Sequence, residues 1–145
     1  MVGTWKDVEF IEGDRGAGQL LETELLASLR NCLPQAENSH FVLAAQDPHG
    51  RLLGGVSATT SYGWLLVKTL WVHSDYRRSG LGRALMARAE RKGVETGCHG
   101  AWLDTSNPAA MQFYLQLGYV TFGKLTNRKD QPPDDHTRWF LKKAL

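Results

Sequence analysis

Alternating polar and apolar residues open the chain and predict a first strand. Over residues 5–11, Val8 and Phe10 alternate with acidic residues, which is the period-2 pattern of a strand with one buried face. Glycines and charged residues over residues 13–18 then predict a turn. We therefore expect a short, half-buried strand that leads through this turn into the next element.

Leucines at helical spacing follow this turn. Leu21, Leu25 and Leu29 recur every four residues, which places them on one face of a helix. The pattern predicts a helix over residues 19–32 that packs on a sheet through its leucine face. We expect the helix to end before Pro34, because a proline ring inside a helix removes a hydrogen bond and clashes with the preceding turn.

Segments rich in β-formers, joined by short turns, make up the middle of the chain. Residues 40–45, 51–60 and 64–73 are apolar runs typical of strands. Short turns over residues 47–50 and 61–63, which contain Pro, Gly and Asp, separate them. Strands joined by such short turns pair with their neighbours, so we expect an antiparallel meander.

A helix and a return strand come after the last strand of the meander. Apolar residues over positions 81–94 recur at helical spacing, and residues 100–104 form a short apolar segment typical of a strand. A helix between two strands allows them to run in the same direction. We expect a parallel strand-helix-strand unit with a right-handed crossover.

A further helix and two strands complete the expected elements. Asn107 is a favourable N-cap and Pro108 suits the first helical position, so a helix is expected over residues 108–117. Residues 119–122 and 137–141 are apolar enough to form the last strands.

The turn over residues 76–82 joins the central strand to the following helix and is the strongest candidate binding site. A helix N-terminus exposes unpaired N–H groups and the positive end of the helix dipole. Gly80 and Gly82 allow close approach of a ligand to the backbone, and Arg77 and Arg78 add positive charge. We expect this turn to hold the pyrophosphate of a nucleotide-like cofactor.

Two common phosphate-binding motifs are absent at this turn. A Rossmann fingerprint needs G-x-G-x-x-G after the first strand of a parallel unit, whereas this turn follows antiparallel strands and offers only Gly80-x-Gly82. The Walker sequence G-x-x-x-x-G-K-[ST] does not occur. Basic residues further along the helix, Arg88, Arg91 and Lys92, fit either a solvated helix face or a surface for a polyanionic ligand.

Composition narrows the class of protein. The chain has 145 residues, 42% of them hydrophobic and 22% charged, as in one globular domain, and a net charge of +2 is too small to indicate a nucleic-acid or membrane surface. Its two cysteines, Cys32 and Cys98, have no metal-ligand spacing, and we expect free thiols and no metal site. No segment resembles a leader or a span of ~18 apolar residues. A soluble, cytoplasmic protein is expected.

Two motifs resemble those of a known family. The segment Arg77-x-x-Gly80-x-Gly82 resembles the R/Q-x-x-G-x-G/A signature of the GNAT superfamily, the acetyl-CoA-dependent N-acetyltransferases. The segment Asn107-x-x-Ala110-x-x-Phe113-Tyr114-x-x-Leu117-Gly118-Tyr119 resembles a later motif of the same family. The resemblance covers residues 40–125 well and the ends loosely.

The resemblance implies a fold class. We expect an α/β (α+β) fold with a GNAT-like, mixed and mostly antiparallel central sheet flanked by helices. One parallel strand-helix-strand unit would carry the cofactor turn. The resemblance also implies a single domain over residues 1–145.

The resemblance also implies where acetyl-CoA binds. The backbone of the central strand would pair with the pantetheine arm, the turn would hold the pyrophosphate, and the later motif would line the arm's channel. The implied cofactor-binding residues are Leu70, Trp71, Val72, Arg77, Arg78, Ser79, Gly80, Leu81, Gly82, Arg83, Asn107, Ala110 and Phe113.

Tyr114 matches the family's usual general acid, which protonates the CoA thiolate as it leaves. A phenol is a suitable donor because its pKa near ~10 keeps it protonated at neutral pH. A tyrosine on an amphipathic helix is otherwise a core residue, and the motif favours the catalytic interpretation. Some family members place a glutamate base on the central strand, where this chain has Leu66. The base therefore stays open among His73, Asp104, Glu24, His136 and a water chain.

Other residues near the expected site have two interpretations. Lys68 shares a strand face with Leu66 by alternation, and it would favour a carboxylate-bearing substrate if that face borders the acceptor pocket. Large aromatic residues are candidate walls of the site, but we expect most of them to fill the core: Trp64, Trp71, Trp102 and Trp139.

The expected function is transfer of acetyl from acetyl-CoA to a primary amine of a small molecule, by direct attack in a ternary complex. Two alternatives stay open: acetylation of a protein or peptide amine, and a noncatalytic acyl-CoA-binding regulatory module. A homodimer is possible, and no nucleic-acid or membrane partner is expected.

Overall fold

The structure is a computed structural model that describes residues 3–4, 6–32 and 38–145. The chain divides into two compact units, Met1–Gln35 and Ala36–Leu145, and each is described by itself. A single domain over the whole chain stays a prediction.

The first unit contains helix α1 (Arg15–Cys32). Its start is fixed by Asp14, whose Oδ1 accepts a hydrogen bond from the Ala17 N–H at 3.0 Å. Such a cap satisfies one of the free N–H groups of the first turn. The helix therefore begins four residues before the expected position 19, and the turn predicted over residues 13–18 was wrong from Arg15 onward. Pro34, the expected stop, lies outside the described residues, and the packing of α1 on the sheet stays a prediction.

The strand predicted over residues 5–11 is wrong for the described residues 6–11, which form turns and irregular backbone. Phe10 and Ile11 are both exposed. Alternation marks the face that a strand would bury, but a strand also needs a neighbour for its backbone hydrogen bonds. The described residues of the first unit provide no such neighbour. Trp5 lies outside the described residues.

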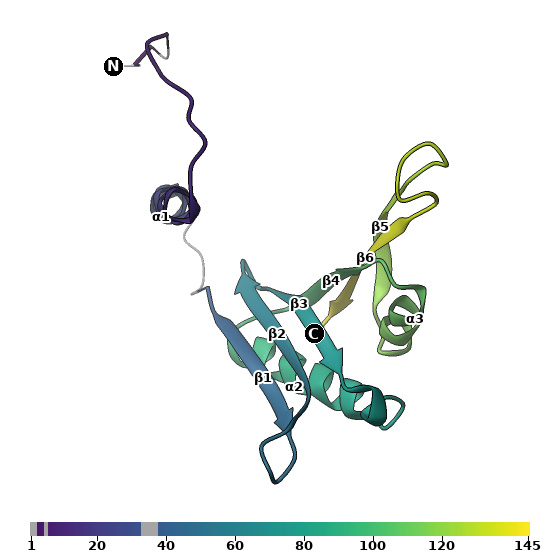
Figure 1. The fold of residues 1–145 in the computed structure, drawn as a ribbon. Coiled ribbons are helices and arrows are strands. Elements are labelled where there is room, and N and C mark those ends of the chain that lie inside the picture. Colours follow the sequence, from purple (N-terminus) through teal and green to yellow (C-terminus); the bar gives the residue numbers. More distant parts are fainter. Residues whose placement is uncertain (1–2, 5, 33–37) are drawn as a thin grey trace. The chain divides into compact units, whose positions relative to one another are not determined.

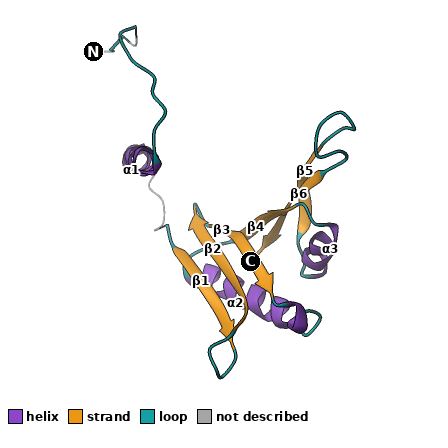
Figure 2. Ribbon diagram, in the orientation of Figure 1, coloured by secondary structure: helices purple, strands orange, loops and turns teal. Residues whose placement is uncertain are grey.

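A six-stranded sheet forms the centre of the second unit (Figures 1 and 2), and its order is β1-β2-β3-β4-β6-β5. The strands lie close to their expected positions, and their bounds are His40–Gln46 for β1, Leu52–Ser61 for β2, Trp64–Val72 for β3, Gly100–Thr105 for β4, Val120–Thr126 for β5 and Thr137–Ala144 for β6. Neighbouring strands are antiparallel except β3 and β4, which are parallel.

Three helical segments accompany this sheet: the 3-10 helix η1 (Ser74–Tyr76) and the α-helices α2 (Leu81–Glu95) and α3 (Pro108–Gln116). Helix α2 connects β3 to β4, which confirms the expected parallel strand-helix-strand unit (Figure 1). Gly93 lets α2 approach β3 closely, because a Cβ there would lie 3.2 Å from Leu65 Cδ2. Within the described residues, no helix is long and apolar enough to cross a membrane.

The core lies between α2 and one face of the sheet. Leu65 on β3, Leu103 on β4 and Leu141 on β6 are at most 1% exposed, and Met86 of α2 is in the same cluster. Burying one such side chain contributes roughly 1.5–3 kcal/mol. The expected fold class is confirmed: a mixed, mostly antiparallel sheet with flanking helices.

Replacing a fully buried leucine tests this core. We expect Leu65→Ala to lower the free energy of unfolding by about 3 kcal/mol, because the deleted methyl groups leave a cavity under α2. Val42→Ala, on the exposed face of β1, is the matched control and should change it by less than about 0.5 kcal/mol. Urea denaturation measures both values. Equal losses in the two variants would contradict the assigned core.

Candidate active site

Strands β3 and β4 separate partway along their length. Only Trp64, Leu65 and Leu66 of β3 pair with β4, and their partners are Gly100 to Trp102. Beyond that point β4 continues to pair with β6, while β3 is held only by β2. The β3 edge over Leu70 to Val72 therefore presents backbone groups that an extended ligand can pair with as an added strand.

A bulge interrupts β3 where this free edge begins. Ser57 of β2 is opposite Thr69 and Ala58 is opposite Val67, so Lys68 is an extra residue without a partner. Bulges redirect side chains and are common beside active sites. Lys68 is exposed, and its facing the acceptor stays a prediction.

The turn after β3 has the geometry of an anion-binding loop. The guanidinium Nε of Arg77 donates to the Val72 carbonyl at 3.2 Å, which ties the turn to the strand end. Ser79 Oγ donates to the Tyr76 carbonyl. Arg78 and Gly80 have positive φ angles of 58° and 90°, in the left-handed region. A Cβ at Gly80 would meet nothing within 4 Å, so the backbone angle is what favours glycine there.

The first turn of α2 offers its N–H groups to a ligand. Gly80 is the N-cap and supplies no capping side chain. The N–H of Leu81 makes only a long contact of 3.4 Å with Ser79 Oγ. Gly82 and Arg83 follow in the same turn, and Arg77, Arg78 and Arg83 are all exposed beside it. Free N–H groups, the helix dipole and three cations make this a suitable site for a phosphate group.

Asn107 caps helix α3 as expected. Its Oδ1 accepts hydrogen bonds from the N–H groups of Ala109 at 2.9 Å and Ala110 at 3.4 Å, and Pro108 follows at the first position. This cap fixes where α3 starts and hence the direction in which its side chains point. Contact of Asn107 with a cofactor arm stays a prediction.

Phe113 joins the two motifs in space. A Cβ added to Gly82 would lie 3.4 Å from Phe113 Cζ and 3.6 Å from Val72 Cγ2. The start of α2, the end of β3 and the middle of α3 therefore meet at one place, although they come from separate parts of the sequence. Ala110, one turn before Phe113, is partly buried against the same core.

Tyr114 is buried next to this junction. Its ring makes edge-on contacts with Phe113, at 5.2 Å between centroids, and with Tyr119, at 5.8 Å. Burial raises the pKa of the Tyr114 phenol to about 12, so the hydroxyl keeps its proton at neutral pH. No group in the described part of the chain forms a hydrogen bond with this hydroxyl, which leaves it available as a donor.

A polar network of Tyr119, Glu90 and Lys143, which could not be predicted from the sequence, lies next to Tyr114. Tyr119 donates its hydroxyl to Glu90 Oε1 at 3.1 Å, and Lys143 Nζ donates to Glu90 Oε2 at 2.9 Å. Burial, followed by the negative charge of Glu90, raises the pKa of the Tyr119 phenol. The Tyr119 N–H also donates to the Tyr114 carbonyl at 3.1 Å. The network thereby links α2, β6 and the end of α3.

Two candidate bases near the strand ends already have structural partners. The ring of His73 contacts the Asp75 N–H through Nδ1 at 3.1 Å and Arg51 Nη2 through Nε2 at 3.0 Å. Asp104 Oδ2 accepts from both Nε and Nη2 of Arg138, each at 2.6 Å. These contacts fix the side chains in place, and the role of base stays a prediction for both.

For the other two candidate bases, Glu24 and His136, the role also stays a prediction. Glu24 is exposed on α1 in the first unit, and His136 lies in the loop before β6. Leu66 is half-buried opposite Trp102 at the last paired position of β3 and β4. An apolar side chain therefore occupies the strand position where a base would be expected.

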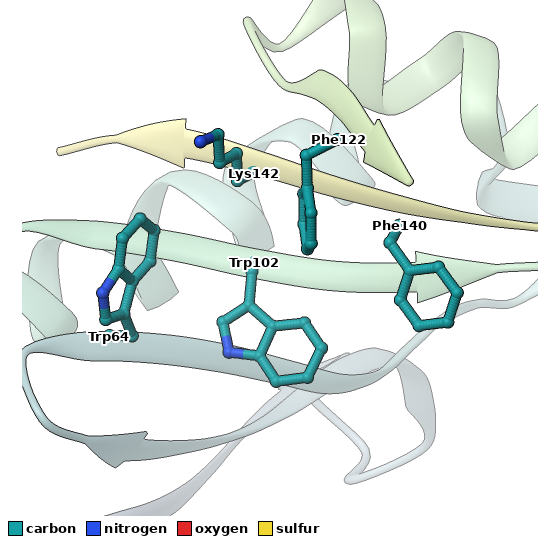
Figure 3. A pocket seen from close by; sticks show the side chains of 5 residues that line it. All are labelled: Trp64, Trp102, Phe122, Phe140 and Lys142. Carbon is teal, nitrogen blue, oxygen red and sulfur yellow. The ribbon is translucent and has the colours of Figure 1, made fainter. Parts of the chain in front are cut away.

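An aromatic hollow of about 440 Å³ opens on the sheet beside the point where β3 and β4 separate (Figure 3). Residues from β3, β4, β5 and β6 line it: Trp64, Trp102, Phe122, Phe140 and Lys142. The expectation that most tryptophans fill the core was wrong. Only Trp139, of the four considered, packs against the buried core, whereas Trp71 is exposed on the edge of β3.

The charges around the aromatic hollow are unevenly compensated. Arg138 lies over the Phe140 ring at 5.5 Å, but Asp104 neutralises it. Lys142 lies over the Phe122 ring at 5.9 Å. In the described ranges no carboxylate pairs with Lys142, whereas the adjacent Lys143 pairs with Glu90.

The fold and the geometry of this site are those expected of an acetyltransferase, and comparison with known proteins identifies the family. The model of the acetyltransferase (GNAT) family matches residues 8–119, so the chain belongs to this family. The resemblance stated from the two motifs is therefore confirmed. The cofactor contacts named above and the role of Tyr114 as the acid stay predictions.

Similar proteins include curated acetyltransferases. The chain is 39% identical over 91 residues to acetyltransferase Atu2258 of Agrobacterium fabrum, covering 63% of this chain and 66% of that protein. It is 42% identical over 85 residues to blasticidin-S acetyltransferase of Streptomyces morookaense, covering 58% of this chain and 60% of that protein. The chain thus spans less than two thirds of the length of these relatives. The crystal structure of an acetyltransferase from Bacillus cereus superposes with a TM-score of 0.80 at 25% identity, covering 94% of this chain and 97% of that one.

A bulky side chain at Gly82 tests the assigned cofactor turn. Gly82→Val places atoms against Phe113 and Val72 and beside the free N–H groups of α2. We expect at least a hundredfold weaker binding of CoA, equivalent to about 2.7 kcal/mol, measured by calorimetry. Ala87→Val, at an exposed and uncharged position of the same helix, controls for helix propensity and should bind CoA within about threefold of wild type. CoA affinity retained in Gly82→Val would argue against this turn.

Proposed function

We propose that this protein is an acetyl-CoA-dependent N-acetyltransferase that acts on a primary amine of a small molecule. The observation that carries the proposal is the free β3 edge, which leads directly into the uncapped N-terminus of α2 with Tyr114 buried alongside. A strand edge suits an extended amide-bearing arm, and a helix N-terminus suits a pyrophosphate. A coenzyme A thioester offers both groups in this order.

In this proposal the pantetheine arm pairs with the backbone of Leu70 to Val72. The pyrophosphate receives hydrogen bonds from the N–H groups of residues 78–83, and the arginines of the turn balance its charge. Phe113 and Ala110 line the channel of the arm, because the Phe113 ring already lies against Gly82 and Val72.

The chemistry is direct transfer in a ternary complex. The neutral amine nitrogen attacks the thioester carbonyl carbon, and a backbone N–H near Val72 stabilises the oxyanion that forms. The carbon–sulfur bond then breaks, and Tyr114 donates its proton to the departing thiolate. The amine proton goes to a base, for which His73, Asp104, Glu24, His136 and a water chain stay open. Acetylated amine and CoA are the products.

A small molecule is proposed as the acceptor because a curated relative, by its name, acetylates the small molecule blasticidin S. The free buried thiol of Cys98 fits a reducing, cytoplasmic setting, which we also propose. A homodimer stays a prediction. Incubation of lysate with labelled acetyl-CoA tests the protein-acceptor alternative, because label would then appear in protein rather than in small molecules.

One observation favours a second candidate function, a noncatalytic acyl-CoA-binding module. Leu66 occupies the strand position at which some family members carry a glutamate base, so the chain lacks that means of deprotonating an amine. Calorimetry that detects CoA binding, together with no acetylated product from a broad metabolite panel, would support this module over the enzyme.

Removing one hydroxyl tests the catalytic proposal. We expect Tyr114→Phe to lower kcat by about 10²–10⁴-fold, because the thiolate then leaves without its proton donor. The KM for acetyl-CoA should stay within about twofold, since the ring and its contacts are retained. Release of CoA thiol over an amine panel measures both constants. Tyr62→Phe, on an exposed turn, is the control, and an equal effect in both variants would reject Tyr114 as the acid.

The raised pKa of Tyr114 has a consequence for stability. The phenol titrates near ~10 in the unfolded chain and at about 12 in the fold, so the fold favours the protonated form. The contribution of this phenol to the free energy of unfolding is complete below pH 10. It is lost as pH rises from 10 to 12, because the unfolded state releases its proton at a lower pH than the folded state. Tyr114→Phe should therefore lose less stability than wild type over that range. Parallel pH profiles from urea denaturation would count against it.

A further inference from the structure

We propose that the aromatic hollow binds the acceptor, and that it selects a primary amine built on a flat ring that also carries a carboxylate. The rings of Trp64, Trp102, Phe122 and Phe140 would hold the ring of the acceptor, and Lys142 would pair with its carboxylate. This inference rests on the proposed function, since it names the substrate class for the same site.

The position of the aromatic hollow suits an acceptor. Trp102 is the last residue of β4 that pairs with β3 before the strands separate, and its partner is Leu66. Its neighbours Ala101 and Leu103 are fully buried under the helices, so by strand alternation Trp102 points to the opposite face of the sheet. A molecule in the hollow would therefore approach the gap between β3 and β4 from the side opposite Tyr114. Attack and protonation of the leaving group would then come from different sides.

The size and lining of the hollow suit a ring. Its volume of about 440 Å³ lies within the usual range of small-molecule pockets, roughly 300–1,000 Å³. Figure 3 shows the indole rings of Trp64 and Trp102 and the phenyl rings of Phe122 and Phe140 around one space. Aromatic side chains favour offset or edge-on contacts with another ring. A flat ring also loses less conformational freedom on binding than a flexible chain.

The charge of the hollow suits a carboxylate. Asp104 compensates Arg138 at one end, which makes that pair neutral overall. Lys142 at the other end has no carboxylate partner among the described residues, and its ammonium lies over the Phe122 ring. Lys142 is thus a charged lining residue without an ion-pair partner among the described residues, and an acceptor carboxylate would supply that partner. Lys68, the sequence-based candidate for this role, is displaced from the strand pattern by the bulge and does not line the hollow.

The test compares matched amines and matched variants. The probes are 4-(aminomethyl)benzoate and benzylamine, which share a ring and an amine and differ in the carboxylate. Binding is measured by calorimetry on the protein saturated with CoA, so that no turnover is needed, and kcat/KM is measured separately with acetyl-CoA. The variants are Lys142→Met, Trp102→Leu and the control Lys129→Met, which removes an exposed lysine from a loop.

We expect wild type and Lys129→Met to bind the benzoate about tenfold tighter than benzylamine, the strength of one charge-assisted contact. Lys142→Met should abolish this preference and leave benzylamine affinity unchanged. Trp102→Leu should weaken both probes about tenfold, while an unchanged melting temperature shows that the fold is intact. A preference retained in Lys142→Met, or no binding of either probe by wild type, overturns the proposal.

Two other outcomes separate the possible causes of failure. Probe binding with the expected variant effects, but without acetyl transfer to any amine, would reject the proposed function and leave the ligand class of the hollow supported. Absence of probe binding combined with a dimer that Phe122→Asp converts to a monomer would assign the hollow to an interface between two copies of the chain. That outcome also overturns the proposal.

Discussion

The separation of β3 from β4 is the constraint on which the rest of this structure depends. Hydrogen bonds join the two strands only up to Leu66 and Trp102, after which β4 pairs with β6 alone. The free edge of β3 follows from this interruption, the turn with Gly80 continues from that edge, and the aromatic hollow lies beside it. Phe113 packs at the open end against Gly82 and Val72, so residues of both motifs meet at the end of β3.

The parts of the fold that were predicted correctly have local causes. Strand β3, the turn with Gly80 and helix α2 follow one another in the sequence, and their geometry depends on neighbouring residues. Asn107 and Pro108 likewise determine the start of α3 within a few positions. The parallel pairing of β3 and β4 could be predicted because a helix separates them and the crossover has a preferred hand.

The parts that were missed depend on residues distant in the sequence. The first strand failed because alternation cannot supply a pairing neighbour. The bulge at Lys68 depends on the register against β2, and no pattern within β3 marks it. Outward-facing Trp102 and Lys142 could be found by alternation, because Trp102 lies between buried Ala101 and Leu103 and Lys142 follows buried Leu141. The direction of Phe122 could not be found in this way, because a register shift between β5 and β6 at this residue sets it. The Glu90–Lys143 pair joins residues 53 positions apart.

The free edge of β3 also has a consequence for solubility. Unpaired strand edges pair readily with other chains, and this is a common route to aggregation. Here the edge lies inside the sheet, between β3 and β4, and Arg77 covers the terminal carbonyl at Val72. A ligand that pairs along the edge completes the sheet and stabilises the folded state by mass action. The same backbone groups would therefore couple the protein's resistance to aggregation to the fraction of molecules with a ligand bound at the β3 edge.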